Sequence, residues 1–371
     1  MTMTTAAGHD ALAIAHQFAL VGEIVSASPY GSGHINDTYK VDVKPAGGPS
    51  RFVLQRINHN VFRRPDELMA NVERVCAHAF AKLKEAGEPN AERRTLRLIP
   101  TLDGKAWHID AAGNRWRCYH FIEGATGHDV VRSPEQAYAA AKSFGAFQSL
   151  LADLPGGRLH ETIPDFHHTP SRFARFQQAL AQDAHGRAAA AVPEIAFALA
   201  RAHEVSVVVE ALRDGTIPER VTHNDTKLNN VLLDDITQEG VCVIDLDTVM
   251  PGSVLYDFGD LVRTSTSPAA EDETDLAKVR MQFPMFEALV KGYLESTRGF
   301  LTPKERDLLP FAGKLITFEI GLRFLTDWLE GDTYFKIKRP THNLDRARTQ
   351  FKLVESIEAQ LSAMQALVAR A

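Results

Sequence analysis

Cysteine is scarce in this 371-residue sequence, and basic residues are not in excess. The three cysteines, Cys76, Cys118 and Cys242, lie far apart and show no CxxC spacing. Their odd number and spacing argue against a disulfide framework or a zinc site, and favour a reducing cytoplasm. The formal net charge is −6 and the isoelectric point is near 6.2. Because general nucleic-acid binding needs a basic face, we expect no nucleic-acid partner.

Long apolar runs are also lacking. No stretch approaches the roughly 18 apolar residues that a membrane span requires. The start, MTMTTAAGHDALAIAHQFAL, has no basic region, and Asp10 and His16 interrupt its apolar residues. We therefore expect a flexible tail that runs into a first helix, not a signal peptide, and no membrane partner.

What the sequence does contain changes character near residue 123. Before that point, GEIVSASPYGSGHINDTYKVDV reads as strand, glycine turn and strand, and RFVLQRI reads as a third strand. A helical pattern follows at 64–87, and three short strands are expected within 96–122. After it, a strand-and-loop segment at 221–260 interrupts helices expected at about 133–154, 171–183, 193–213, 274–297, 303–329 and 343–369. The sequence thus predicts an α+β, bilobal protein, with a small β-rich lobe at 1–122 and a larger, mainly helical lobe at 123–371.

The most polar part of this insert is HNDTKLNN at 223–230, and the apolar run GVCVIDLD follows it. Asp225 is placed to accept a proton from a hydroxyl nucleophile, and Lys227 to meet phosphate charge. Asn230 and Asp245 offer oxygen ligands to Mg²⁺. An isolated H-x-D is usually a hydrogen-bonded surface turn, but the whole set supplies the parts that phosphoryl transfer needs.

This arrangement resembles the phosphotransferase family of kinase-like fold that includes aminoglycoside phosphotransferases, choline kinases and homoserine kinases. The resemblance implies ATP as the phosphoryl donor, Asp225 as the catalytic base, and Asn230 and Asp245 as Mg²⁺ ligands. Asp257 and Asp260 in YDFGD are expected to brace the catalytic loop by hydrogen bonds. For the adjacent pair His167 and His168 we expect a loop or pocket-wall role, not a metal site.

The expected nucleotide contacts lie in the first lobe. Gly31, Ser32 and Gly33 form a turn whose backbone amides can approach phosphate oxygens. The connector YHFIEG offers backbone groups to an adenine edge, which places Phe121 and Ile122 at the nucleotide. Related enzymes carry a lysine on the third strand, where this chain has Gln55 followed by Arg56. We expect Arg56 to reach phosphate with Glu73 as its orienting partner, although a surface position for Arg56 is also open.

Longer blocks narrow the acceptor. THNDTKLNNVLLD, CVIDLDTVMPGSVLYDFGDLVR, GSGHINDTYKV and LQRINHNVF resemble the N-acetylhexosamine 1-kinase branch of this family. The resemblance spans nearly the whole chain and implies transfer to the anomeric hydroxyl of GlcNAc or GalNAc. Hydroxyl groups of a sugar are bound by carboxylates, amides and imidazoles, with an aromatic ring on the apolar face. The candidate sugar contacts, each of which could also be an ordinary surface or packing residue, are His34, Asn36, Asp225, Asp247, Arg323, Asp327 and Tyr334.

Two alternatives stay open at this stage. The first is a kinase of the same fold with another hydroxyl acceptor, such as a different hexose, an aminoglycoside or an amino alcohol. The basic late segment, which includes Arg323, Lys336 and Lys338, argues against a polycationic acceptor. The second is a non-catalytic, pseudokinase-like binding module, which only the missing strand lysine favours. As partners we expect ATP and a small sugar, with the protein a monomer or homodimer.

Overall fold

The computed structural model describes residues 9–31, 33, 35–45, 47 and 51–371. The chain forms two compact units, which we call the sheet unit and the helical unit. The sheet unit comprises Met1–Ala125, Asp153–Ile163 and Val241–Met250. The helical unit comprises Thr126–Ala152, Pro164–Gly240 and Pro251–Ala371. Two later segments thus return to the sheet unit, while a single lobe division at 122/123 remains a prediction.

The sheet unit is built on an antiparallel sheet with the strand order β1-β2-β3-β6-β4, and β5 pairs with β6. Its strands are β1 (Gly22–Pro29), β2 (Asp37–Pro45), β3 (Arg51–Arg56), β4 (Leu98–Ile99), β5 (His108–Ile109) and β6 (Arg115–His120). Strand β10 (Gly240–Val243) is not part of this sheet. Because side chains alternate across a strand, Phe52 and Leu54 of β3 both face the core. The predicted strands on either side of the glycine turn, and the third strand after them, are confirmed as β1, β2 and β3.

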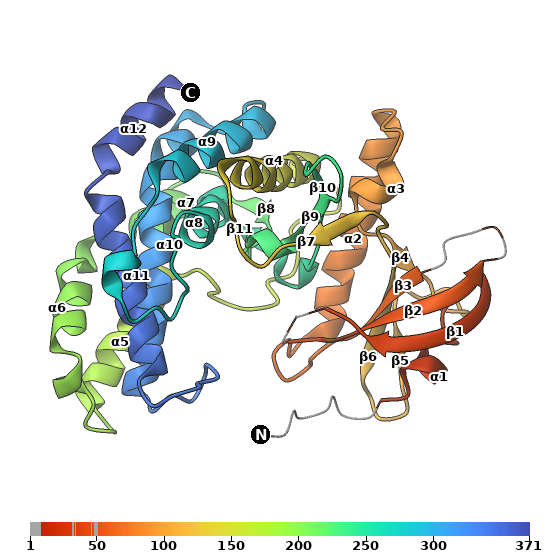
Figure 1. The fold of residues 1–371 in the computed structure, drawn as a ribbon, viewed down its shortest axis with the longest axis horizontal. Helices are drawn as coiled ribbons and strands as arrows, with labels where there is room; N and C mark the ends of the chain where they lie inside the picture. Colours follow the sequence, from red (N-terminus) through yellow and green to blue (C-terminus); the bar gives the residue numbers. More distant parts are fainter. Residues whose placement is uncertain (1–8, 32, 34, 46, 48–50) are drawn as a thin grey trace. The chain divides into compact units, whose positions relative to one another are not determined.

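The sheet unit also contains helices and a 3-10 turn, and recognisable sequence features mark where its longest helix begins. They are α1 (Ala11–Ala15), α2 (Pro65–Glu85), α3 (Ala91–Arg94) and the short 3-10 turn η4 (Leu246–Thr248). Helix α2 begins at a proline, which is tolerated in the first turn because its missing N–H would have no partner there. Leu68, Val72 and Val75 of α2 are buried and form its apolar face, in agreement with the helical pattern predicted at 64–87. Figure 1 shows α1 below the sheet edge, where Ala11 and Ala15 join the sheet's core.

The helical unit is organised around one long helix, α10, which packs against α5, α8, α11 and α12 (Figure 1). Its helices are α4 (Pro134–Leu151), α5 (Thr169–Gln182), α6 (Val192–Ala200), α7 (Val207–Arg213), α8 (Val254–Ser265), α9 (Phe283–Thr297), α10 (Pro303–Leu329), α11 (His342–Glu358) and α12 (Leu361–Arg370). Short strands and 3-10 turns complete it: β7 (Ala125–Gly127) at its first entry, β8 (Arg220–Thr222), β9 (Val231–Asp234), β11 (Met250–Gly252), η1 (Ala188–Ala190), η2 (Ala202–Glu204), η3 (Leu228–Asn230) and η5 (Leu276–Lys278). The α+β composition predicted from the sequence is confirmed.

Three predicted helices were too long. The segment at 193–213 is divided by η2 into α6 and α7, and that at 343–369 is divided into α11 and α12. The segment at 274–297 becomes helical only at Phe283, because Pro284 is accommodated only in a helix's first turn. The apolar residues recur at helical spacing through all three segments, so the sequence pattern did not show where the helices end or begin. Across the described part of the chain, no helix is long and apolar enough to cross a lipid bilayer.

Candidate active site

The HNDTKLNN segment forms a loop between β8 and β9 of the helical unit. His223 and Asn224 are buried, whereas Asp225 and Lys227 are half-buried. Asn224 adopts a left-handed backbone with φ of 65°, a conformation that asparagine tolerates better than most residues. The loop therefore has a buried backbone and presents Asp225 and Lys227 toward solvent.

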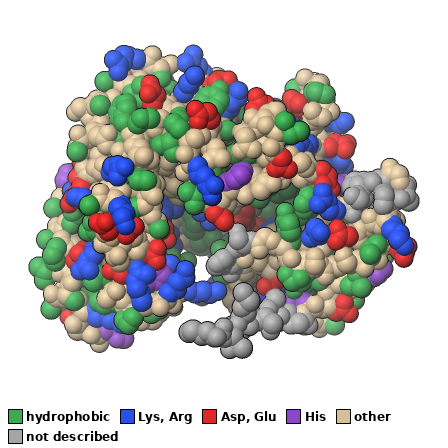
Figure 2. Space-filling model, in the orientation of Figure 1, with side chains coloured by type: hydrophobic (Ala, Val, Ile, Leu, Met, Phe, Trp, Pro, Cys, Tyr) green, Lys and Arg blue, Asp and Glu red, His purple; other side chains and the backbone are tan. Residues whose placement is uncertain are grey.

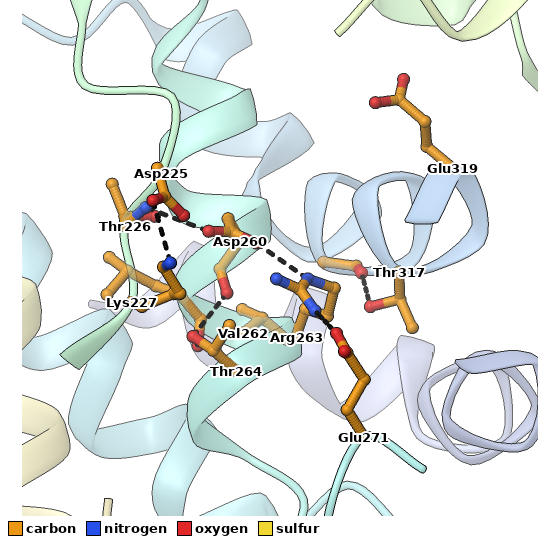
Figure 3. A network of polar contacts seen from close by, with 12 residues as sticks. Asp225, Thr226, Lys227, Asp260, Val262, Arg263, Thr264, Glu271, Thr317 and Glu319 are labelled. Atoms are coloured by element: carbon orange, nitrogen blue, oxygen red, sulfur yellow. Dashed lines mark hydrogen bonds and ion pairs between the residues drawn. The ribbon is translucent and has the colours of Figure 1, made fainter. Parts of the chain in front are cut away.

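Two aspartates of α8 hold this loop by its backbone. Asp257 accepts hydrogen bonds from the N–H of His223 at 2.9 Å and of Asn224 at 2.6 Å. Asp260 accepts one from the N–H of Thr226 at 3.0 Å, as Figure 3 shows. Both aspartates are buried, and they lie three residues apart, on one face of the helix. The predicted bracing role of Asp257 and Asp260 is confirmed.

The two bracing carboxyl groups have opposite electrostatic settings. Burial raises the pKa of Asp257 above its usual range. Burial also acts to raise the pKa of Asp260, but the neighbouring Arg263 guanidinium outweighs it and the pKa falls. Arg263 Nε lies 2.8 Å from Asp260, and its Nη1 lies 3.1 Å from Glu271 (Figure 3). Asp260 is therefore an ionised anchor under the loop.

The loop brings three predicted site residues together. Lys227 Nζ lies 3.0 Å from Asp225 Oδ2. Asn230 Nδ2 donates to the Asp225 backbone oxygen at 2.8 Å and to Oδ2 at 3.1 Å. A carboxylate held by a cation and an amide has a defined orientation, which a proton acceptor needs.

The same geometry bears on metal binding. Both hydrogen bonds of the Asn230 side chain to described residues use Nδ2, so its Oδ1 is the atom suited to a hard cation. Among the described residues, no group of three or more His, Cys, Asp or Glu could hold a metal. An amide oxygen such as Asn230 Oδ1 and a carboxylate such as that of Asp245 are the kinds of ligand that Mg²⁺ takes, and metal binding by these residues remains a prediction.

Asp245 and Asp247 belong to the sheet unit and follow β10 directly. Asp245 is exposed and has a left-handed backbone, with φ of 60° at the start of η4. Asp247 is only 2% exposed and forms a buried ion pair with Arg117. Its Oδ2 accepts a hydrogen bond from Asn36 Nδ2 at 2.5 Å. Asp247 and Asn36, both predicted as sugar contacts, therefore bind each other.

Arg117 is the residue that the sequence interpretation missed. It lies on β6, is 1% exposed, and donates to Gln55 Oε1 from Nε at 3.1 Å and from Nη2 at 2.9 Å. Register pairs Gln55 with Arg117 across β3 and β6. Burial opposes its charge, but Asp247 and other acids raise the pKa of Arg117 above its ordinary value. The sequence did contain a signal, because Arg117 stands between the apolar residues Trp116 and Cys118 in a predicted strand.

The partner predicted for Arg56 needs correction. Arg56 Nε donates to Asp37 at 2.6 Å, and Nη1 donates to Asn114 at 3.4 Å. Glu73 is exposed on α2. The cause is strand register, because Asp37 of β2 lies directly opposite Arg56 of β3.

The glycine turn and the connector meet within the sheet unit. Tyr30, just before Gly31, packs edge-on against Phe121 with ring centroids 5.6 Å apart. Gly31 has a left-handed φ of 82°, which favours glycine. Gly33 is exposed and Ile122 is buried. Ser32 and His34, predicted at the nucleotide and the sugar, lie outside the described residues.

The late candidates also lie together. Arg323, Asp327 and Tyr334 line one pocket of the helical unit. The other lining residues are Arg172, Arg175, Thr326, Glu330 and Phe335. In Figure 2, Lys and Arg side chains gather over the loop that follows α10, at the lower edge of the helical unit. Their contact with a substrate remains a prediction.

Comparison with known proteins places this architecture. Residues 26–290 match the family model described as the phosphotransferase enzyme family. A microcompartment-associated aminopropanol kinase is 20% identical with a TM-score of 0.62, over 95% of this chain and 98% of that one. An aminoglycoside phosphotransferase from Alicyclobacillus acidocaldarius is 14% identical with a TM-score of 0.63, over 99% and 98%. A spectinomycin phosphotransferase, solved with ADP and spectinomycin, is 12% identical with a TM-score of 0.51, over 91% and 92%.

At these identities the solved structures speak for the fold, and they share the kinase-like fold expected from the sequence. The family model covers well over half of the chain and includes the 223–230 loop and Asp245. By that match, this protein belongs to the phosphotransferase enzyme family.

Proposed function

We propose that this protein is an ATP- and Mg²⁺-dependent kinase that phosphorylates the anomeric hydroxyl of an N-acetylhexosamine, GlcNAc or GalNAc, to give the sugar 1-phosphate. The observation that carries the kinase assignment is the Asp225, Lys227 and Asn230 arrangement on a loop braced by α8. The sugar assignment rests on the sequence blocks that resemble the N-acetylhexosamine 1-kinase branch.

In the proposed reaction, Asp225 accepts the proton of the anomeric hydroxyl while that oxygen attacks the γ-phosphorus in line. Lys227, 3.0 Å from Asp225, orients the carboxylate and offers positive charge to the phosphates. Asn230 and Asp245 are the proposed Mg²⁺ ligands, and bound Mg²⁺ would neutralise charge on the phosphate oxygens. The chain's own contribution is positioning and electrostatic preorganisation.

For ATP we propose the turn at Gly31, Ser32 and Gly33 together with the connector at Phe121 and Ile122. The contact between Tyr30 and Phe121 joins these two segments and supports one shared nucleotide site. The related spectinomycin phosphotransferase holds ADP.

The proposed phosphate contacts differ from those that the family resemblance implies, because Gln55 stands in place of the strand lysine. Arg56 is half-buried and tied to Asp37. Arg117 holds Asp247, two residues after the proposed metal ligand Asp245. We therefore propose that Arg117 positions the Asp245 segment. This role was not predicted from the sequence.

The proposed acceptor contacts are His34, Asn36, Asp247, Arg323, Asp327 and Tyr334. Another acceptor on the same machinery is the second candidate, because one related solved structure is an aminopropanol kinase. An amino alcohol carries a cation, whereas the pocket that holds Arg323 is lined by three arginines and two acids. That charge balance favours the sugar.

The cysteines bear on the proposed cellular location, and the site residues bear on the non-catalytic alternative. Cys76, Cys118 and Cys242 are buried and not joined in disulfides, which supports the proposed reducing cytoplasm. A monomer or a homodimer is compatible with this proposal. A binding module without activity is disfavoured, because Asp225, Asn230 and Asp245 are all present.

The decisive variant is Asp225→Asn, which removes the proton acceptor but keeps the shape of the side chain. We expect phosphoryl transfer to fall by at least about a hundredfold, with ADP binding measured by calorimetry nearly unchanged. A coupled-ADP assay over sugars and amino alcohols measures the loss and identifies the acceptor. Turnover close to that of the unmodified protein in this variant would sink the assignment of Asp225.

A further inference from the structure

The pocket between α5, α10 and the loop after α10 has an unusual charge balance. Arg172 and Arg175 come from α5, Arg323 and Asp327 from α10, and Tyr334 from the loop. The space open to water-sized groups is about 60 Å³. With roughly 10–15 Å³ needed per water, this is room for about four to six waters, enough for a small polar group and not for a whole nucleotide.

The two acids of this pocket are already engaged. Glu330 accepts two hydrogen bonds from Arg175, at 2.9 and 2.6 Å. Asp327 accepts hydrogen bonds from the backbone N–H groups of residues 333–335 at 2.8–3.0 Å, and one from Asn343 Nδ2 at 2.8 Å. Asp327 is thus the anchor of the loop, and neither acid is turned to the other arginines.

Arg172 and Arg323 lack carboxylate partners in the described part of the chain. Arg172 Nη2 donates only to backbone oxygens, those of Asp165 and Phe166, each at 3.0 Å. Its Nε is buried without any hydrogen-bond partner among the described residues. Burial and the charge of Arg323 lower the pKa of Arg172. Two guanidinium groups that repel each other and have no carboxylate partner among the described residues form a site that an anion would complete.

Arg323 is held by aromatic rings. Its guanidinium carbon lies 5.8 Å from the ring centroid of Tyr334 and 5.6 Å from that of Phe335. Such contacts fix the side chain without neutralising its charge. Its N–H donors have no hydrogen bond or ion pair within the residues that the structure describes, and they can serve a ligand in the pocket.

The pocket adjoins the bracing of the catalytic loop. Glu319 lies four residues, about one helical turn, before Arg323 on α10. Glu319 Oε1 lies 2.9 Å from His167 Nδ1, and His167 Nε2 lies 3.1 Å from the backbone oxygen of Asn224. Thr169, three residues before Arg172, donates to Glu319 Oε2 at 2.6 Å. The same two helices therefore carry both the pocket and the support of the residue next to Asp225.

We propose that this pocket binds an anionic group, a carboxylate or a phosphate monoester, carried by the acceptor whose hydroxyl reacts at Asp225. The inference rests on the proposed function and names its substrate class as an acidic N-acetylhexosamine derivative. The reacting oxygen forms the bond to the γ-phosphorus as the bond to ADP breaks, and Asp225 takes the proton. The anionic group itself is unchanged.

The test measures binding separately from transfer. Calorimetry compares GlcNAc with GlcNAc 6-phosphate and with GlcNAc oxidised to a carboxylate at C6, and a coupled-ADP assay then follows phosphorylation of each. Two charge-assisted hydrogen bonds predict that an anionic ligand binds roughly tenfold to a hundredfold tighter than GlcNAc. The two derivatives distinguish phosphate from carboxylate. The preference should shrink as salt rises.

Arg323→Gln should remove most of this preference, so that in the variant the anionic sugars bind within about threefold of GlcNAc. The matched control is Arg213→Gln, which removes the same charge from an exposed position on α7 of the same unit and should keep the preference. If both anionic sugars bind no better than GlcNAc to the unmodified protein, the inference is overturned, whether or not Arg323→Gln folds. If an anionic sugar binds tightly but no sugar is phosphorylated, the anion site stands and the proposed function fails.

Discussion

At the scale of single residues, Gln55 and Arg117 are the most informative pair. The third strand lacks the lysine that the family resemblance implies, and the neighbouring strand supplies a buried arginine opposite it. Arg117 contacts both Gln55 and Asp247, so one guanidinium links two strands to the segment after β10. The cation beside Gln55 in this unit is therefore on β6 and is paired with Asp247.

The first prediction tests that buried ion pair. Arg117→Met leaves the Asp247 carboxylate buried without a counter-charge, and we expect a loss of about 3–5 kcal/mol in the free energy of unfolding. Urea denaturation followed by circular dichroism measures it.

The double variant Arg117→Met with Asp247→Asn should recover much of that loss, because no buried charge then remains. Arg56→Gln serves as the control, since Arg56 and Asp37 are partly exposed at 15% and 28% and their pair contributes less. Equal losses in Arg117→Met and Arg56→Gln would contradict a special role for the buried pair.

At the scale of elements, α8 and α10 do the positioning. Helix α8 presents Asp257 and Asp260 to the loop at 223–230. Helix α10 presents Glu319, Arg323 and Asp327 along its length. A carboxylate near the end of α10 fixes the following loop through three backbone N–H groups. Regular helices thus define two irregular segments that carry the proposed chemistry.

The prediction at this scale concerns Asp327. Asp327→Asn replaces an acceptor-only carboxylate with an amide that can accept at one atom only. We expect a loss of about 1–3 kcal/mol in unfolding free energy and faster amide hydrogen exchange at residues 333–335. Asp307→Asn, on the exposed side of the same helix, should change stability by no more than about 0.5 kcal/mol. Unchanged exchange at 333–335 in Asp327→Asn would rule out the anchoring role.

At the scale of the whole molecule, the proposed machinery is distributed over both units. The sheet unit carries the glycine turn, Arg117, Asp245 and Asp247, and the helical unit carries the 223–230 loop and the arginine-lined pocket. Within the helical unit, the buried pair of His167 and Glu319 ties α10 to the loop backbone. Both ring nitrogens of His167 face oxygen acceptors, which favours the doubly protonated imidazolium.

That pair predicts how stability depends on pH. Burial alone would lower the pKa of His167, but Glu319 outweighs it and the pKa is raised above 6.5. A raised histidine pKa contributes stability that is fully present below about pH 6.5 and is lost as pH rises through the folded-state pKa. His167→Asn should therefore lower the melting temperature more at about pH 6 than at about pH 9.

Differential scanning fluorimetry at both pH values measures this difference. His203→Asn is the control, because His203 is 76% exposed and lies 3.6 Å from Glu204. We expect that control to show little change at either pH. A His167→Asn penalty that is equal at both pH values would show that the imidazolium is not what stabilises the unit.

Much of this protein follows from local sequence alone. Strand alternation, glycine turns and proline in first helical turns act over a few residues, and they determine the strands, most helices and the composition of the loop at 223–230. The bracing by Asp257 and Asp260 was also predictable, since their spacing puts both carboxylates on one helix face.

Tertiary structure decided the rest, because it pairs residues far apart in the chain. Register alone put Asp37 opposite Arg56 and Arg117 opposite Gln55. The apolar patterns at 193–213 and 343–369 are continuous in the sequence. Tertiary packing decided where α6 ends and α7 begins, and where α11 ends and α12 begins. Likewise, the backbone N–H groups of the loop after α10 hydrogen-bond to Asp327. Arg172 and Arg323 line the pocket beside it. The sequence determined which chemical groups are present, and long-range contacts determined which of them are occupied with one another and which can meet a ligand.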